Sequence, residues 1–206
     1  MLRTLQDYRK AGFGSQFAWL DLVNSQERDG FGRLTDHLLN PPWVAHFLGH
    51  FHLADSLPNN VPRRALADLR EFLRGVAEHL AAGRTLSISD VRVLNATLMV
   101  PARQKLFQRQ NGFRAELLPV HAGWPWILSR IAGSLAETLT HYDRERVKIC
   151  ANDGCRWAYY DVTKGNTRRW CSDKTCGNRD RVRRARAAAK RRRSGRSILA
   201  ARRSRL

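Results

Sequence analysis

Apolar residues recur at helical spacing in three stretches of the chain. The strongest pattern covers residues 62–82, where leucines fall on one side of a helix and charged residues separate them. Gly83 is expected to end this helix. A second helix is predicted over residues 89–98, with Ser89-Asp90 as its cap, and a third over residues 124–141.

Shorter signals fill the intervals. Residues 17–25 are apolar and sharply delimited, which is typical of a short strand or a first helical turn, and residues 26–33 have the composition of a charged loop. Asn40-Pro-Pro-Trp43 is typical of a helix entrance. Segments on either side of Asn111-Gly112, a dipeptide favoured in tight hairpin turns, predict a two-stranded ribbon. The pattern as a whole predicts a mainly α (α+β) fold: a helical N-terminal domain with a small β-hairpin.

The charge of the chain is concentrated at one end. The formal net charge of the 206 residues is +19. Residues 1–143 carry 16 Lys and Arg against 13 Asp and Glu, whereas residues 144–206 carry 21 against 5. We therefore expect a near-neutral domain over residues 1–143, a basic module over 144–193 and a disordered basic tail over 194–206. Such asymmetry favours a polyanionic partner.

The four cysteines form two pairs with the same spacing, Cys150 with Cys155 and Cys171 with Cys176. Two short-range pairs separated by a loop can bring four thiolates into a tetrahedral shell. We therefore predict one structural Zn²⁺, because a Cys-only shell leaves no open coordination position for catalysis. An iron–sulfur centre with the same ligands and four buried free thiols are the alternatives.

The segment between the two pairs also has a local pattern. Residues 157–161 and 167–170 are β-prone and lie on either side of Lys164-Gly165-Asn166, which predicts a hairpin between two metal-binding knuckles. With a helix after Cys176, the order of knuckle, hairpin and helix is that of a treble-clef zinc module. So short a segment depends on its metal for a stable core.

Two sets of motifs resemble known families. The run Arg168-Arg-Trp-Cys-Ser172, followed by Cys176-Gly-Asn-Arg179, resembles the CGNR zinc finger. Leu20-Asp-Leu-Val-Asn-Ser25 and Ile88-Ser-Asp-Val-Arg-Val-Leu-Asn95 resemble the ABATE domain that accompanies this finger. The resemblance implies a DNA-binding, stress-linked transcription regulator with zinc on the four cysteines.

A cationic segment follows the last cysteine. Nine of the fifteen residues from 179 to 193 are Arg or Lys, and as a helix they would span about 22 Å, enough to lie along a duplex groove. Asn178 is expected to cap this helix, and Arg179 and Arg183 to reach base edges. Repulsion between like charges predicts fraying from about Ala187 onward until phosphates neutralise it. The predicted nucleic-acid contacts are Arg168, Arg169, Lys174, Asn178, Arg179, Arg181, Arg183, Arg184, Arg186 and Lys190.

Other candidate groups are weaker. His46 and His50 have the spacing of two helical metal ligands, with His52 nearby, but residues of this kind are more often packed or exposed. Asp21 and Asn24 suit either a small-molecule pocket or, as we prefer, a capping and turn role. The sequence contains no phosphate-binding Gly-rich loop or nucleophile elbow, and we do not expect an enzyme.

The function predicted from these patterns is DNA binding in transcriptional control, with residues 1–143 as a sensing or interaction domain. The alternatives are an RNA- or ribosome-associated protein and an enzyme whose active site lies in residues 1–143. Exposed aromatics at Trp157, Tyr159 or Tyr160 would favour RNA, although we expect them to pack in the core. The sequence shows neither a signal peptide nor a membrane span, so we expect a cytoplasmic protein. A homodimer and a small-molecule effector are further expectations.

Overall fold

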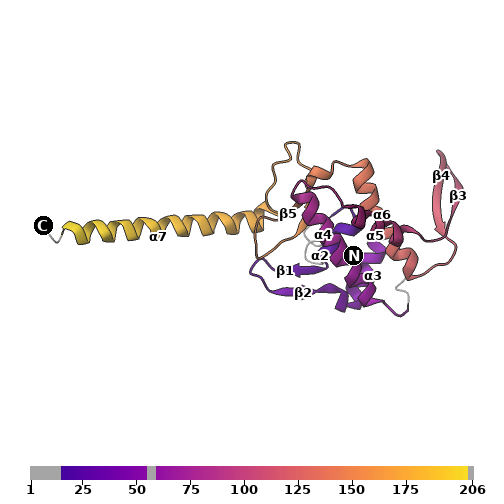
Figure 1. The fold of residues 1–206 in the computed structure, drawn as a ribbon, viewed down its shortest axis with the longest axis horizontal. Coiled ribbons are helices and arrows are strands. Elements are labelled where there is room, and N and C mark those ends of the chain that lie inside the picture. Colours follow the sequence, from indigo (N-terminus) through magenta and orange to yellow (C-terminus); the bar gives the residue numbers. More distant parts are fainter. Residues whose placement is uncertain (1–14, 55–58, 204–206) are drawn as a thin grey trace.

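The computed structural model describes the backbone of residues 15–54 and 59–203, and side chains of these residues as far as residue 191. The described part of the chain is mainly helical with small antiparallel hairpins, which confirms the mainly α prediction. A helical body carries two projections at opposite ends, the C-terminal helix α7 and the ribbon β3–β4 (Figure 1). Within the described residues, no helix has the length and apolar character needed to cross a membrane.

The core of the body is built on α4, whose apolar side faces the other helices. Leu66, Leu73 and Val76 of this helix are at most 1% exposed, as the sequence pattern predicted. Gly83, with a φ of +70°, follows the end of α4 in the left-handed conformation that favours glycine. The helices of the body are α2 (Ala18–Asn24), α3 (Pro41–His50), α4 (Arg63–Ala81), α5 (Ile88–Leu98) and α6 (Trp124–His141).

The segment at residues 17–25, for which strand and helix were both open, forms the helix α2. Every residue of α2 is buried, including the polar residues Asp21 and Asn24. This short helix packs against both α4 and α6, so all of its sides meet other parts of the protein. Complete burial explains why the segment shows no helical alternation of apolar and polar residues.

Three antiparallel two-stranded sheets complete the fold. They are β1 (Gln26–Arg28) with β2 (Leu34–Asp36), β3 (Ala102–Arg109) with β4 (Gly112–Pro119), and β5 (Val147–Ile149) with β6 (Ala158–Tyr160). The ribbon β3–β4 confirms the hairpin predicted around Asn111-Gly112. Residues 26–33, predicted as a loop, instead contribute the strand β1 and the turn that leads to β2. Short 3₁₀ turns η1 (His37–Leu39) and η2 (Arg144–Arg146) precede α3 and β5.

The cap of α5 differs from the prediction. Ser87 is the N-cap, and its hydroxyl accepts a hydrogen bond from the Asp90 backbone while the Asp90 carboxylate accepts one from the Ser87 backbone. The reciprocal capping box requires an acidic residue three positions after the cap, and Asp90 stands in that relation to Ser87. Ser89 lies inside the first turn and contacts the Ser87 hydroxyl.

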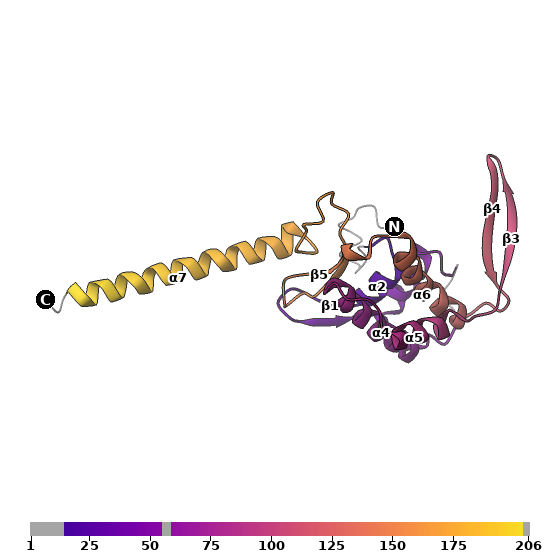
Figure 2. The ribbon, with the colours of Figure 1, turned by 45° about the horizontal axis from the view of Figure 1, so that its top comes forward.

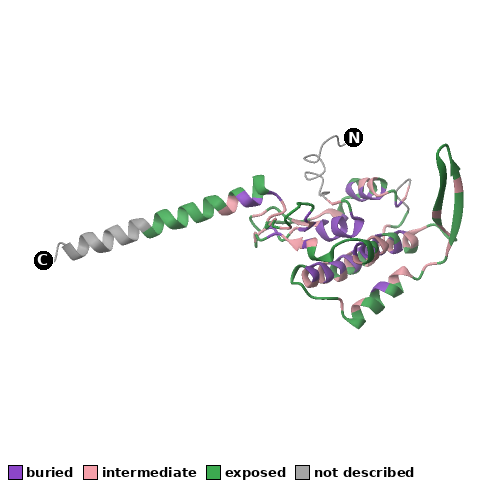
Figure 3. Ribbon diagram, turned by 90° about the horizontal axis from the view of Figure 1, so that it is seen from above, coloured by how far each residue is buried: buried purple, intermediate pink, exposed green. Residues whose placement is uncertain are grey.

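The helix α7 (Asn178–Arg203) continues directly from a π-helical turn, η3 (Asp173–Gly177). Asn178 therefore has helical backbone angles and does not act as the predicted cap. The helix also extends to Arg203, through residues for which we predicted disorder, because Arg and Ala are good helix formers and Gly195 is the only strong breaker there. Figures 2 and 3 show α7 leaving the body as a single rod whose described side chains beyond its first turn are exposed. Residues 204–206 lie outside the described residues.

Candidate metal centre and nucleic-acid interface

The four cysteines meet in one place, where their sulfur atoms all lie within 4.8 Å of one another. The Sγ atoms of Cys155 and Cys171 are 3.7 Å apart, and those of Cys171 and Cys176 are 3.8 Å apart. A tetrahedral zinc ion with Zn–S bonds of about 2.3 Å requires an S···S separation of about 3.8 Å. The donor set and its spacing therefore fit one structural zinc ion.

The four thiols are close enough together to affect one another's protonation. Hydrogen bonds with Cys155 and Cys171 lower the pKa of Cys150 to about 7. Hydrogen bonds with Cys150, Cys155 and Cys176 raise the pKa of Cys171, so this sulfur retains its proton when no cation is bound. Four crowded sulfurs cannot all ionise without a compensating charge, and a divalent cation supplies it.

Local hydrogen bonds shape each knuckle. In the first, the Asn152 carbonyl accepts bonds from the backbone of Cys155 and Arg156, and the Asn152 amide lies 3.6 Å from the sulfur of Cys176. In the second, Gly177 packs so closely that a β-carbon there would lie 2.5 Å from a carboxylate oxygen of Asp173. Because that oxygen ends an exposed side chain that can move aside, the contact does not by itself require glycine at residue 177.

The predicted hairpin between the knuckles is wrong in its pairing. β6 pairs with β5, on the other side of Cys150 and Cys155, so the first knuckle is itself the turn of the hairpin. The segment 167–170 forms no strand, and Asp161 orders the chain leading to it. The Asp161 carboxylate accepts hydrogen bonds from Thr163 and the Arg168 backbone and lies 3.3 Å from Lys148 Nζ. Although burial opposes this, the hydrogen bonds lower the pKa of Asp161 to about 2.

The finger is attached to the helical body through buried contacts. Val147 of β5 and Ala158 of β6 are 0% exposed and belong to the same core as α2 and α4. The Asn24 side chain donates to the Ala158 carbonyl at 2.8 Å and accepts from the Ala158 amide at 2.9 Å. Asn24 thus binds the edge of β6 as a neighbouring strand would. The turn role that we preferred for Asn24 is wrong, because its partners lie 134 residues away.

Arg168 was predicted to contact nucleic acid, but its guanidinium faces the second knuckle. It donates to the carbonyls of Trp170 and Cys171 and lies 4.6 Å from the centre of the Tyr159 ring. These contacts hold the chain on either side of a zinc ligand. Arg169 and Lys174 are exposed, and the Arg169 guanidinium lies over the Trp170 ring.

Ion pairs order the cations at the start of α7. Asp180 accepts from Arg183 at 2.7 Å and pairs with Arg184 at 2.9 Å, and Arg181 pairs with Asp173 at 3.1 Å. The hydrogen bond from Arg183 lowers the pKa of Asp180. All these pairs are at the surface, where such contacts contribute little and exchange readily with other anions. Arg186 and Lys190 are exposed further along the helix.

Arg179 is held by the N-terminal part of the chain. Its guanidinium donates to the Asp29 carbonyl at 2.8 Å and lies 4.4 Å from the centre of the Phe31 ring. A base contact by Arg179, as we predicted, would require these two interactions to be given up. The prediction that Trp157, Tyr159 and Tyr160 pack in the interior is better supported, since Tyr159 is 4% exposed and the other two are half-buried.

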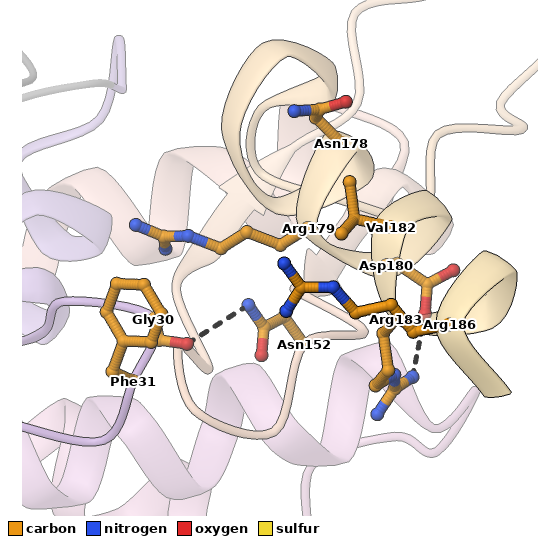
Figure 4. Close-up of a pocket in the computed structure, with 9 residues that line it drawn as sticks. All are labelled: Gly30, Phe31, Asn152, Asn178, Arg179, Asp180, Val182, Arg183 and Arg186. Carbon is orange, nitrogen blue, oxygen red and sulfur yellow. Dashed lines mark hydrogen bonds and ion pairs between the residues drawn. The ribbon is translucent and has the colours of Figure 1, made fainter. Parts of the chain in front are cut away.

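A cleft of about 420 Å³ lies between the β1–β2 loop and the first turns of α7 (Figure 4). Sequence reasoning missed the loop residue Phe31, which is 81% exposed at the mouth of this cleft. The available signal was an aromatic residue placed between Gly30 and Gly32 in a polar segment. The lining residues are Gly30, Phe31, Asn152, Asn178, Arg179, Asp180, Val182, Arg183 and Arg186.

The histidines of α3 and the turn after it do not form a comparable cluster. Within the part of the chain that the structure describes, the four cysteines are the only group of three or more candidate ligands close enough to hold a metal ion. Burial and the proximity of His46 and His52 lower the pKa of His50, which favours its neutral form. The rings of His50 and Phe51 are in edge contact, as expected for packing residues.

Two protein-family models match the chain. The ABATE model, described as "Putative stress-induced transcription regulator", matches residues 17–142, and the CGNR zinc finger model matches residues 146–192. Both resemblances inferred from the sequence motifs are therefore confirmed. None of the curated proteins compared with the chain matches it significantly.

Proposed function

Because the chain belongs to the ABATE family and carries a CGNR zinc finger, we propose that it binds DNA through α7 and regulates transcription. The observation that carries the proposal is the arrangement of cations on α7. At about 100° per residue, Arg179, Arg183, Arg186 and Lys190 fall within a sector of about 60° on this helix. We call these four residues the cationic stripe.

The stripe begins at the metal centre. Arg179 lies three positions after Cys176, so the zinc ion fixes the direction in which the helix leaves the body. A helix that starts from a rigid base can present its charges to the phosphates of a duplex in a defined register. The lack of an apolar side along residues 183–191 argues against a role in protein packing for this part of α7.

Residues 17–142 are proposed to carry the signal that the regulator receives. They share a buried core with β5 and β6, and Asn24 binds the β6 edge directly. A change in the packing of α2 would therefore reach the zinc finger through buried contacts and not through a flexible linker. This coupling is what a sensing domain requires in order to alter DNA binding.

A salt titration tests the proposal. Fluorescence anisotropy with the zinc-loaded protein would measure binding to genomic fragments, random duplex and structured RNA at several salt concentrations. If Arg183, Arg186 and Lys190 each neutralise a phosphate while Arg179 stays bound to the β1–β2 loop, log Kobs should fall with log salt at a slope of about −2.7. Genomic fragments should keep an advantage over random duplex as the salt concentration rises, since base contacts release no counterions.

Single substitutions make the test specific. Arg186→Gln should weaken binding to all duplexes and reduce the salt slope by about one. Arg103→Gln, an exposed arginine on β3 at the opposite end of the body, is the matched control and should change neither quantity. Equal effects of the two substitutions would contradict the role of the stripe. Preferential binding of structured RNA over every duplex would favour the RNA-associated alternative instead.

The enzyme alternative receives less support from the clefts. The cleft at the β1–β2 loop and a second one of about 350 Å³, beside Arg169 and Trp170, both lie at the zinc finger. Their linings are rich in arginine, with one carboxylate in each, and that carboxylate is paired with arginine. This arrangement suits the binding of an anion better than acid–base chemistry.

A further inference from the structure

The β1–β2 loop presents an aromatic ring to solvent beside the cationic stripe. Phe31 is 81% exposed, although burying a side chain of this type would contribute about 2 kcal/mol of stability. One face of its ring is covered by the Arg179 guanidinium at 4.4 Å. A ring in this position can pack on a sugar or on the apolar edge of a base in a duplex while the neighbouring cations contact phosphates.

The β1–β2 loop is held at its base on β2 and by hydrogen bonds within the loop. At its base, the buried Arg70 forms two hydrogen bonds with Asp36, of 2.8 and 2.9 Å, and so fixes β2 to α4. Within the loop, the Asp29 carboxylate accepts hydrogen bonds from the backbone of Phe31 and Arg33. The position of the ring is therefore set before any ligand arrives.

The tip of the loop lies against the finger. A β-carbon on Gly154 would stand 2.7 Å from the Gly30 carbonyl, so this contact is possible only with glycine at residue 154. A β-carbon on Gly30 would overlap the Arg179 guanidinium. Gly30 also has a φ of +86°, a conformation that side chains rarely adopt. Two glycines, one from each part of the chain, thus allow the loop to close one wall of the cleft.

The two walls of the cleft differ in chemistry. One wall offers the flat apolar ring of Phe31, and the other offers the guanidinium groups of Arg183 and Arg186 (Figure 4). A nucleotide unit has the matching pair of features, a flat base on a sugar and an anionic phosphate. The cleft ends at Arg186, and the cationic stripe continues beyond it on α7 to the exposed Lys190.

We infer that residues 29–33 of the N-terminal domain form part of the DNA interface. In this interface, Phe31 contacts a base or sugar of the bound strand while Arg183 and Arg186 contact its phosphate. The inference rests on the proposed function and adds to it, because it places a direct DNA contact on the ABATE domain. The domain would then affect DNA binding by moving the loop as well as through the shared core.

Substitution of Phe31 tests this inference. Phe31→Ala should weaken duplex binding roughly 5- to 30-fold, because the ring would bury only part of its apolar surface against a sugar or a thymine methyl group. The loss should be the same at every salt concentration, with an unchanged salt slope, since the ring carries no charge. Phe31→Tyr, which keeps the ring, should bind within about twofold of the wild type.

The matched control is Phe113→Ala. Phe113 is 71% exposed on β4, at the end of the body opposite α7, and its removal should leave binding unchanged. Arg186→Gln on the stripe provides the contrast, because it should change the salt slope. Zinc content and thermal midpoint, measured for each variant, show whether the fold is retained.

The possible results distinguish failure of the Phe31 contact from failure of DNA binding by α7. If Phe31→Ala binds as the wild type does while Arg186→Gln weakens binding, the cleft contact is overturned and DNA binding by α7 stands. If the wild-type protein does not bind duplex, both fail. If Phe31→Ala loses zinc, the contact can be tested with Phe31→Trp instead. Duplex should then quench the tryptophan fluorescence of Phe31→Trp more than that of the wild type. Equal quenching of the two proteins would overturn the inference.

Discussion

Truncation of Asn24 is the most direct test of how the zinc finger is joined to the helical body. Asn24 is 1% exposed, and its side chain forms two hydrogen bonds with the backbone of Ala158, which is fully buried. The Cys150 amide donates to the Trp157 carbonyl across the β5–β6 pair. In the antiparallel alternation, the polar groups of Ala158 therefore face away from β5, toward Asn24.

The expected fall in the free energy of unfolding follows from this geometry. Asn24→Ala would leave the Ala158 N–H and C=O buried without partners. Each such group costs about 1–3 kcal/mol, so the free energy of unfolding should fall by about 2–6 kcal/mol. Typical domains have about 5–15 kcal/mol in total, so the change should be easy to measure. Asn24→Asp should be similarly harmful, because a carboxylate cannot donate to the Ala158 carbonyl.

Urea denaturation of the zinc-loaded protein, followed by circular dichroism and tryptophan fluorescence, would measure the change. The midpoint should fall with little change in the slope of the transition. Asn95→Ala, at an exposed position on α5, is the matched control and should alter the stability by less than about 0.5 kcal/mol. A loss below about 1 kcal/mol for Asn24→Ala would refute the view that Asn24 completes the edge of β6.

Three further predictions follow from the finger and α7. Cys171→Ser should lower the zinc content below one ion per chain and abolish the preference for genomic fragments over random duplex. The far-UV helical signal of residues 17–142 should persist. Loss of that signal would show that the helical body depends on the metal. Asp161→Asn should destabilise the protein by about 1–3 kcal/mol at pH 7, because the NH₂ group that replaces one carboxylate oxygen cannot accept a hydrogen bond from the backbone of Thr163 or Arg168. The pKa of Asp161 is about 2 in the folded protein, below the value of about 3.9 expected in the unfolded chain. The difference in thermal stability between wild type and Asp161→Asn should therefore be fully present above pH 4 and shrink toward pH 2. A constant difference across that range would contradict the lowered pKa of Asp161. Ellipticity at 222 nm should become more negative when salt or duplex is added, since like charges oppose the distal half of α7, and an unchanged signal would count against that repulsion.

Local patterns in the sequence were sufficient for the helices α4, α5 and α6, the ribbon and the metal ligands, but not for α2. The helices α4 and α6 have one buried side, and that side appears in the sequence as an apolar residue every three or four positions. The ribbon β3–β4 is set by Asn111-Gly112, whose turn preference acts between adjacent residues. The ligand pairs, likewise, are close in the chain, so their spacing alone indicates how each knuckle bends.

Tertiary structure alone decided the roles that depend on distant partners. The β-prone residues 157–161 predicted the strand β6, but not its pairing with β5, which forms because Val147 and Ala158 complete the core against α2 and α4. Asn24 is polar but fully buried, and its function is apparent only once β6 lies beside it.

The roles of the charged residues of the finger also depend on distant partners. Arg168 and Arg179 are two of many arginines in this part of the sequence, yet Arg168 holds the second knuckle and Arg179 holds the β1–β2 loop. The net charge of residues 144–206, which composition alone gives, predicts a polyanionic partner. The packing of segments 150 residues apart decided which cations are exposed. The same packing places Phe31 beside them.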